Sequence, residues 1–188
     1  MNVYDFDNTL YDGESSVDFF LYYIKKDPAL VRYLPKVMNA ILRYKAGKIT
    51  IEDALKDYGK LISEYVRGMD DPEQDVKRFW DKNQYFVKRF YKQLQQEDDL
   101  IITASPSLLI REIAKRLGIR HYLSSEIDLE TGEITQLCYR ENKVKIFKER
   151  YPGVKIHNFY TDSMNDKPLM DLSENVYFVR KHRIEKIK

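Results

Sequence analysis

The pattern of apolar and polar positions divides the chain into two kinds of segment. Between residues 14 and 96, apolar residues recur at helical spacing and are interrupted by residues that cap or break helices. The best marked of these helices are expected over residues 29–46, 51–67 and 72–94, where Asp-Pro pairs, a threonine capping box and glycines mark the ends. Four helices in sequence predict a small helical bundle.

The rest of the chain alternates short apolar segments with helical ones. The expected strands are residues 2–6, 100–103, 155–161 and 176–179 with a hairpin over residues 127–135, and the expected helices are residues 106–117, 141–150 and 168–172. This alternation predicts an α/β fold, a Rossmann-like parallel sheet with helices on both faces. We expect a core domain of residues 1–13 and 97–188, with residues 14–96 inserted as a helical cap domain.

Composition narrows the class of protein. The chain has 188 residues, of which 43% are apolar and 33% charged, as in folded globular proteins. The net charge of only +2 gives no support for a nucleic-acid partner. No apolar run approaches the roughly 18 residues of a membrane span, and we expect no signal peptide because the acidic motif lies within the first residues. With Cys138 as the only cysteine, the expectation is a cytoplasmic protein without disulfides, and oligomeric state is left open.

The sequence Asp5-Phe6-Asp7-Asn8-Thr9 directly follows the start of the first predicted strand. Alternate side chains of an extended segment share a face, so Asp5 and Asp7 lie about 6–7 Å apart on one side. Such a pair suits an acid-dependent reaction. On its own, an Asp-x-Asp pair is better explained by solvated acids at a strand end or by an N-cap that leads into a turn.

Three further polar segments occupy comparable places. Thr103 ends one predicted strand, Lys143 lies in the first turn of a predicted helix, and Asp162 to Asp166 follow another strand. Parallel sheets carry their sites at the carboxyl ends of strands, so these residues are expected to meet. Each alone has an ordinary structural explanation, as an edge residue, a solvated lysine or a turn.

Taken together and in this order, these residues resemble the four motifs of the haloacid dehalogenase superfamily of phosphohydrolases. The resemblance covers nearly the whole chain, including a helical cap between the first and second motifs. It also includes the absence of a large insertion between Thr103 and Lys143. Within the superfamily the chain looks most like the phosphoserine-phosphatase-like branch, subfamily IB, with a C1-type cap.

The resemblance implies a role for each catalytic position. Asp5 would be the nucleophile that forms an aspartyl phosphate, and Asp7 would act as general acid and then as general base. Thr103 would donate its hydroxyl to a phosphate oxygen, and Lys143 would offset charge on the transferred group.

The resemblance also implies Mg²⁺ as cofactor, held by the Asp5 and Asp162 carboxylates and the Asp7 backbone carbonyl. Asp166 would act directly, or through water and Lys143. Candidate phosphate and substrate contacts are Asn8 in the turn, Ser105 where a helix begins, and Glu14, which stands where phosphoserine phosphatases carry a cap glutamate.

The chain departs from these relatives at three places. Thr161 replaces the usual glycine before Asp162, residues 103–106 replace a Ser-Gly-Gly-Phe-like motif, and Tyr58 stands where a substrate-binding cap arginine is expected. Phosphoserine is therefore possible but not favoured. Aromatic residues of the cap are expected mainly in its core, with some lining an apolar leaving-group pocket that faces Asp5.

The favoured function is thus a Mg²⁺-dependent phosphatase that hydrolyses a small-molecule phosphate monoester. A phosphotransferase would use the same residues. A dehalogenase is disfavoured because Asp7, an acid suited to an alkoxide leaving group, would be superfluous with halide. A non-catalytic binding protein of this fold is disfavoured because every charged catalytic position is retained. The basic segment from Arg180 to Lys188 is expected to be solvated, with contact to anionic lipid or nucleic acid as the alternative, and its role is left open.

Overall fold

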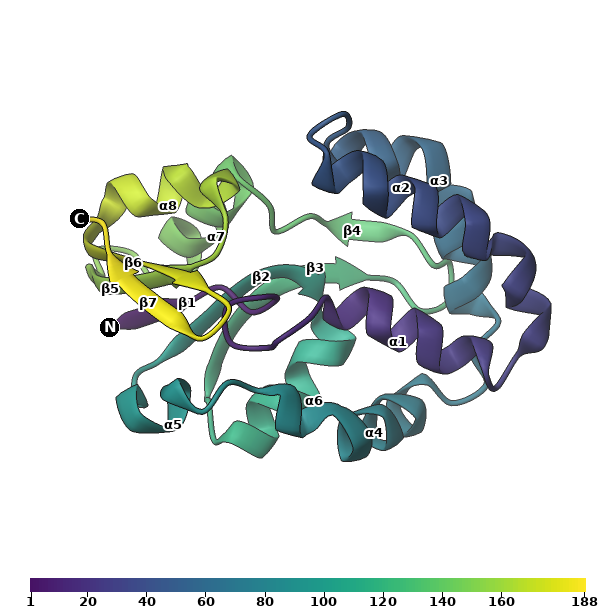
Figure 1. Cartoon of the computed structure of the whole chain (residues 1–188), viewed down its shortest axis with the longest axis horizontal. Coiled ribbons are helices and arrows are strands. Elements are labelled where there is room, and N and C mark those ends of the chain that lie inside the picture. The colour runs from purple at the N-terminus through teal and green to yellow at the C-terminus, as the bar shows by residue number, and fades with distance from the viewer.

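The computed structural model describes the backbone of residues 1–188 and all side chains except those of Lys45, Ile51 and Tyr58. Across this backbone, seven strands form one sheet in the order β4-β3-β2-β1-β5-β6-β7 (Figure 1). The five inner strands are parallel, and β4 and β7 pair antiparallel at the two edges. The strands are β1 (Asn2–Tyr4), β2 (Leu100–Pro106), β3 (His121–Ile127), β4 (Ile134–Gln136), β5 (Ile156–Thr161), β6 (Ser173–Arg180) and β7 (Arg183–Lys186). The predicted α/β fold is confirmed.

Helices cover both faces of this sheet. They are α1 (Ser15–Ile24), α2 (Leu34–Lys45), α3 (Ile51–Arg67), α4 (Pro72–Asn83), α5 (Phe90–Leu94), α6 (Ser107–Leu117), α7 (Glu141–Arg150) and α8 (Lys167–Leu172), with 3₁₀ turns η1 (Pro28–Tyr33), η2 (Gln84–Phe86) and η3 (Met164–Asp166). Neighbouring strand residues point to opposite faces. Tyr4 packs in a core with residues of α4 and α6, whereas Val3 packs with residues of α7 and α8. β1 is therefore buried on both sides, as the central strand of a parallel sheet must be.

Two of the predicted cap helices are interrupted. The helix expected over residues 29–46 is η1 followed by α2, because Pro35 in the first turn of α2 has no N–H to donate to the preceding turn. The helix expected over residues 72–94 ends at Asn83. After the 3₁₀ turn η2, the N–H of Lys88 donates to the carbonyl of Leu10 (2.7 Å), which holds this segment against the loop after β1.

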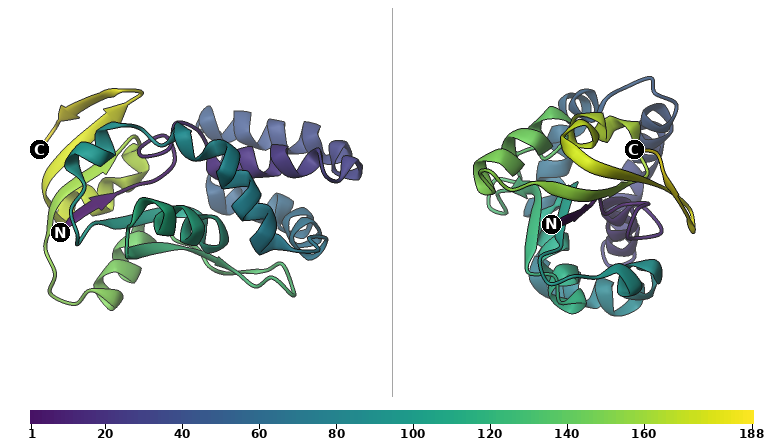
Figure 2. Two further views of the ribbon diagram at one scale, coloured as in Figure 1. Left: turned by 90° about the horizontal axis from the view of Figure 1, so that it is seen from below. Right: turned by 90° about the vertical axis from the view of Figure 1, so that its left-hand side faces the viewer.

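The helices between β1 and β2 do not pack as an independent bundle. Helices α2 and α3 lie side by side beyond the carboxyl ends of the strands, at the end of the molecule opposite the two termini (Figure 2). Helix α4 instead packs against α6, where the indole Nε1 of Trp80 donates to the carbonyl of Leu109 (2.9 Å). The division into a core and a cap at residues 14 and 96 stays a prediction.

The edges of the sheet add strands that the pattern did not predict. β3 starts at His121 and runs parallel to β2 before it enters the predicted hairpin, where Ile127 pairs with Ile134. The basic C-terminal segment is mostly exposed, as expected for a solvated segment, but its backbone is not a free tail. After a turn at Lys181, residues 183–186 pair with β6 as β7, because β6 would otherwise present an unpaired edge.

Candidate active site

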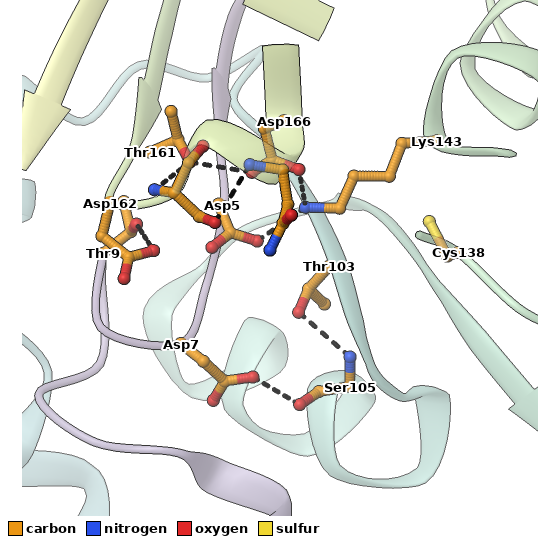
Figure 3. A network of polar contacts seen from close by, with 12 residues as sticks. Asp5, Asp7, Thr9, Thr103, Ser105, Cys138, Lys143, Thr161, Asp162 and Asp166 are labelled. Atoms are coloured by element: carbon orange, nitrogen blue, oxygen red, sulfur yellow. Dashed lines mark hydrogen bonds and ion pairs between the residues drawn. The ribbon is translucent and has the colours of Figure 1, made fainter. Parts of the chain in front are cut away.

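Three charged side chains form a buried network at the carboxyl ends of the central strands (Figure 3). The Lys143 Nζ, from the first turn of α7, lies 2.9 Å from Asp5 Oδ1 and 2.7 Å from Asp166 Oδ1. All three residues are more than nine-tenths buried. Burial alone would lower the pKa of Lys143, but the charges of Asp166 and Asp5 outweigh it and hold that pKa above its ordinary value. The lysine is therefore a fixed cation.

The pKa of Asp5 is raised, chiefly because burial disfavours its charged form. Lys143 opposes this shift, while the charges of Asp166 and Asp162 add to it. Asp5 follows β1 directly, and its N–H donates to the carbonyl of Tyr160 on β5 (2.9 Å), so the sheet itself holds its backbone. The ionised state of Asp5 thus depends on nearby positive charge.

Thr161 has a specific contact in this site. Its Oγ1 donates to Asp166 Oδ2 (2.8 Å) and accepts from the Ser163 N–H (3.1 Å). Both Asp166 oxygens are therefore engaged, one by Thr161 and one by Lys143. This favours an indirect role for Asp166, in which it orients Lys143, over direct contact with a metal. Thr161, which stands where a glycine is usual, therefore stabilises the last motif through its hydrogen bonds.

Asp7 lies among serine residues. Ser105 Oγ donates to Asp7 Oδ2 (2.5 Å), and the Ser15 N–H donates to Asp7 Oδ1 (2.6 Å). Burial raises the pKa of Asp7 to about 6 against the lowering effect of these hydrogen bonds. The hydroxyls of Ser15 and Ser16 each lie 3.0 Å from that of Ser105, so α1 and β2 meet here. Sequence reasoning missed Ser15 and Ser16, although they open the helix directly after Glu14.

The turn after Asp7 brings the first and last motifs together. Asn8 adopts a left-handed backbone (φ 56°) and its Nδ2 donates to Glu14 Oε1 (2.8 Å). Thr9 Oγ1 donates to Asp162 Oδ1 (3.3 Å). Burial, together with the charges of Glu14 and Asp166, raises the pKa of Asp162 to about 6. A cation that binds beside Asp162 would favour the ionised form of this carboxyl.

A cavity of about 380 Å³ joins these groups. Its walls include the predicted site residues Asp5, Asp7, Asn8, Glu14, Thr103, Lys143, Asp162 and Asp166. Ser105 lies behind Asp7 instead, and its N–H donates to Thr103 Oγ1 (3.1 Å). The structure therefore brings every predicted position to one place, with Ser105 in contact with the wall.

The cavity also has lining residues that the sequence did not single out. Tyr44 reaches it from α2, and its hydroxyl accepts from Asn165 Nδ2 (3.3 Å). Arg140 donates to Asn165 Oδ1 (3.1 Å), and Tyr139 completes this side. The side chain of Tyr58, where a substrate-binding arginine was expected, lies outside the described side chains. An inserted helix thus covers the site through Tyr44.

The donor set fits a hard divalent cation. Within the described part of the chain, no three histidine, cysteine, aspartate or glutamate side chains converge as a metal cluster by themselves. Mg²⁺ does not need such a cage, since it is commonly held by one or two carboxylates with waters and substrate phosphate. Asp5 and Asp162 supply two such carboxylates, and burial together with neighbouring acidic groups raises the pKa of both, so a bound cation would favour their ionised forms.

The family model for haloacid dehalogenase-like hydrolases matches residues 3–171. The chain belongs to this family. No curated protein matches it, whereas solved structures of the same fold do. A protein of unknown function from Bordetella pertussis Tohama I has a TM-score of 0.72 at 20% identity, covering 91% of this chain and 85% of that one.

Two further solved structures share the fold. A phosphoserine phosphohydrolase-like protein from Francisella tularensis subsp. tularensis SCHU S4 has a TM-score of 0.63 at 19% identity, covering 94% of this chain and 86% of that one. A phospho-aspartyl intermediate analogue of a phosphoserine phosphatase has a TM-score of 0.57 at 15% identity, with coverage of 93% and 83%. At such identities the likeness is one of fold. Along the described residues, no helix combines the length and apolar character that crossing a membrane requires.

Proposed function

We propose that this hydrolase is a Mg²⁺-dependent phosphatase that hydrolyses a small-molecule phosphate monoester through an aspartyl phosphate on Asp5. The observation that carries the proposal is the contrast between two carboxyls at the end of one strand. Asp5 contacts the fixed cation Lys143, whereas Asp7 lies among serines with a pKa of about 6. Two carboxyls in different environments suit two different roles, a nucleophile and a proton donor.

In the first half-reaction, a carboxylate oxygen of Asp5 forms a bond to phosphorus while the bond from phosphorus to the ester oxygen breaks. Lys143 holds Asp5 Oδ1, so we assign the attack to Oδ2. Asp7, protonated below its pKa, transfers its proton to the departing alkoxide. The products are the aspartyl phosphate and a free alcohol, with Asp7 left as a carboxylate.

In the second half-reaction, the Asp7 carboxylate takes a proton from water, and the water oxygen attacks phosphorus. Asp5 leaves as a carboxylate, inorganic phosphate is released and Asp7 again carries a proton. The Ser105 hydroxyl and the Ser15 N–H keep the Asp7 carboxyl in place for both transfers. An alcohol acceptor in place of water would make the reaction a phosphotransfer.

The remaining groups bind the dianionic phosphate. Thr103 Oγ1 accepts from the Ser105 N–H, and its own proton is then available for a phosphate oxygen. Lys143 supplies positive charge beside the nucleophile. Mg²⁺, held by Asp5, Asp162 and the Asp7 carbonyl, would neutralise charge shared by the phosphate and the carboxylates.

The test is release of inorganic phosphate from p-nitrophenyl phosphate and from a panel of phosphorylated metabolites, with Mg²⁺ and with excess chelator. We expect release that requires Mg²⁺ and that Asp5→Asn abolishes while the circular dichroism spectrum stays unchanged. Absence of release from every ester would contradict the phosphatase. Turnover retained by Asp5→Asn would remove Asp5 as nucleophile, and alcohol phosphates formed in place of phosphate would indicate the phosphotransferase.

A further inference from the structure

A second cavity, of about 350 Å³, lies between the inserted helices and the β3–β4 hairpin. Helix α1 contributes Phe20, α2 contributes Val37 and α3 contributes Leu55, while Ile127 and Ile134 come from the hairpin. Its volume is within the range of about 300–1,000 Å³ typical of small-molecule pockets. The cavity is therefore large enough to hold part of a substrate.

The lining of this apolar cavity is uncharged. Among its described lining residues, only Ser16, Tyr65 and Ser125 carry a polar side-chain atom, and none carries a charge. Moving an amino acid zwitterion or a sugar into such surroundings would leave polar groups without hydrogen bonds, which is costly. A hydrocarbon entering it would instead gain from burial.

The apolar cavity adjoins the active site on the side of the proposed acid. Ala104 lines both cavities. Ser16, in the wall of the apolar cavity, has its Oγ 3.0 Å from the Oγ of Ser105, and that hydroxyl donates to Asp7. The acid must lie within hydrogen-bond distance of the ester oxygen, so the carbon attached to that oxygen lies near Asp7 as well. The leaving group is thereby directed toward the apolar cavity.

The far wall of the apolar cavity is held by a close backbone contact. Ser63 Oγ of α3 donates to the carbonyl of Gly132 in the hairpin turn (3.0 Å). A Cβ at Gly132 would lie 2.5 Å from the backbone of Ser63, so only glycine permits this approach. The hairpin and α3, which both contribute lining residues, are thus held against each other beside the cavity.

We propose that the substrate is the phosphate monoester of an apolar aliphatic alcohol, with its phosphate at Asp5 and its hydrocarbon chain in the apolar cavity. This inference rests on the proposed phosphatase function and names the class of its leaving group. The charged cavity takes the dianion, and the uncharged one takes the chain.

The test measures kcat/KM for ethyl, butyl, hexyl and octyl phosphate, with O-phosphoserine as the polar comparison, all below their micelle-forming concentrations. We expect kcat/KM to rise by roughly threefold to fourfold for each methylene that enters the cavity. Values that stay flat or fall with chain length, or a preference for O-phosphoserine over octyl phosphate, would overturn the inference.

Two variants on neighbouring residues of α2 give the matched control. Val37 lines the apolar cavity, whereas Met38 is 40% exposed. Val37→Trp fills the cavity and is expected to remove most of the preference for octyl over ethyl phosphate. Met38→Trp adds a similar side chain outside the cavity and is expected to leave the preference unchanged. Equal loss in both variants, or none in either, would contradict the assigned place of the chain.

A binding measurement separates this inference from the catalytic proposal. Octylphosphonate and methylphosphonate have no ester bond to cleave, and calorimetry reports their affinities directly. We expect tighter binding of octylphosphonate with a negative heat-capacity change, the mark of apolar burial. If octyl binding is favoured but no ester is hydrolysed, only the phosphatase proposal fails; if esters are hydrolysed without a preference for longer chains, only the apolar leaving group fails.

Discussion

Lys143 Nζ lies 2.9 Å from Asp5 Oδ1, although the two residues are 138 positions apart in the chain. The same ammonium bonds to Asp166, so one cation serves two buried carboxylates. In the absence of this cation, burial would drive the pKa of Asp5 higher still, and an aspartate that carries a proton is a poor nucleophile.

Lys143→Met is therefore expected to abolish measurable phosphate release at neutral pH and to lower the free energy of unfolding by about 3–5 kcal/mol. Urea denaturation and a phosphate assay measure the two effects. Lys145→Met is the control, since Lys145 is exposed on the same helix and should cost little in either assay. An active Lys143→Met enzyme would contradict the role given to this charge.

The second prediction concerns the pH dependence of turnover, which follows from the proton on Asp7. With a pKa of about 6, the protonated fraction of Asp7 falls about tenfold for each pH unit well above that value. Esters with poor leaving groups need this proton, so their kcat/KM should fall as pH rises above about 6. p-Nitrophenyl phosphate, whose leaving group is stable as an anion, should show a weaker dependence on the acid.

Asp7→Asn tests the same role through the leaving group. The variant is expected to lose at least 10²-fold more kcat/KM with an alkyl phosphate than with p-nitrophenyl phosphate in the first half-reaction, measured by rapid mixing. Equal losses with both esters would show that Asp7 does not protonate the leaving oxygen.

The contact between the hairpin and α3 gives a prediction on stability. Gly132 (φ +72°) and Gly153 (φ +75°) share a left-handed backbone, but a Cβ meets the Ser63 backbone only at Gly132. Gly153→Ala should lower the free energy of unfolding by roughly 1–2 kcal/mol, because only the left-handed backbone is strained there. Gly132→Ala should cost more, because the hairpin or α3 must also move, and thermal denaturation of both variants gives the difference. Equal costs would show that this approach is not needed for stability.

Asp99 gives a prediction on the pH dependence of stability. Burial raises the pKa of Asp99 above its ordinary value of 3.8, against hydrogen bonds from the Gln96 N–H and the Tyr91 hydroxyl. The folded state thus binds this proton more tightly than the unfolded chain, so Asp99 makes folding less favourable as pH rises through the folded pKa.

Asp99→Asn is expected to raise the free energy of unfolding at pH 7 and to have little effect well below pH 3.8, where both states are protonated. Asp98→Asn is the neighbouring control, because Asp98 is largely exposed. Denaturant titrations across this pH range measure the difference. A gain for Asp99→Asn that grows as pH falls would reverse the predicted sign.

Local signals accounted for much of the fold. The capping box of Thr50 and Asp53 is present as predicted, and Gly118 ends α6 with a left-handed backbone. These features succeed as predictions because a cap or a C-terminal glycine acts within one helical turn. Parallel strands run in one direction, so residues at their carboxyl ends lie close together. This correctly placed Asp5 and Thr103 next to each other.

Other features depend on partners distant in sequence. The break after α4 is made by the bond from Lys88 to Leu10, and β7 exists because β6 offers it an edge. Apolar spacing continues past residue 83, and residues 183–186 belong to a basic segment, so the local pattern contains no sign of either feature.

The site divides in the same way. The sequence by itself predicted which groups lie at the site, because Asp5 and Asp7 share one face of an extended segment and their order with the later motifs resembles the family pattern. Only the tertiary structure decided how those two carboxyls differ. Asp5 meets a lysine from α7 and Asp7 meets serines from α1 and β2. Burial and neighbouring charge set a pKa, and both arise only when distant segments pack together.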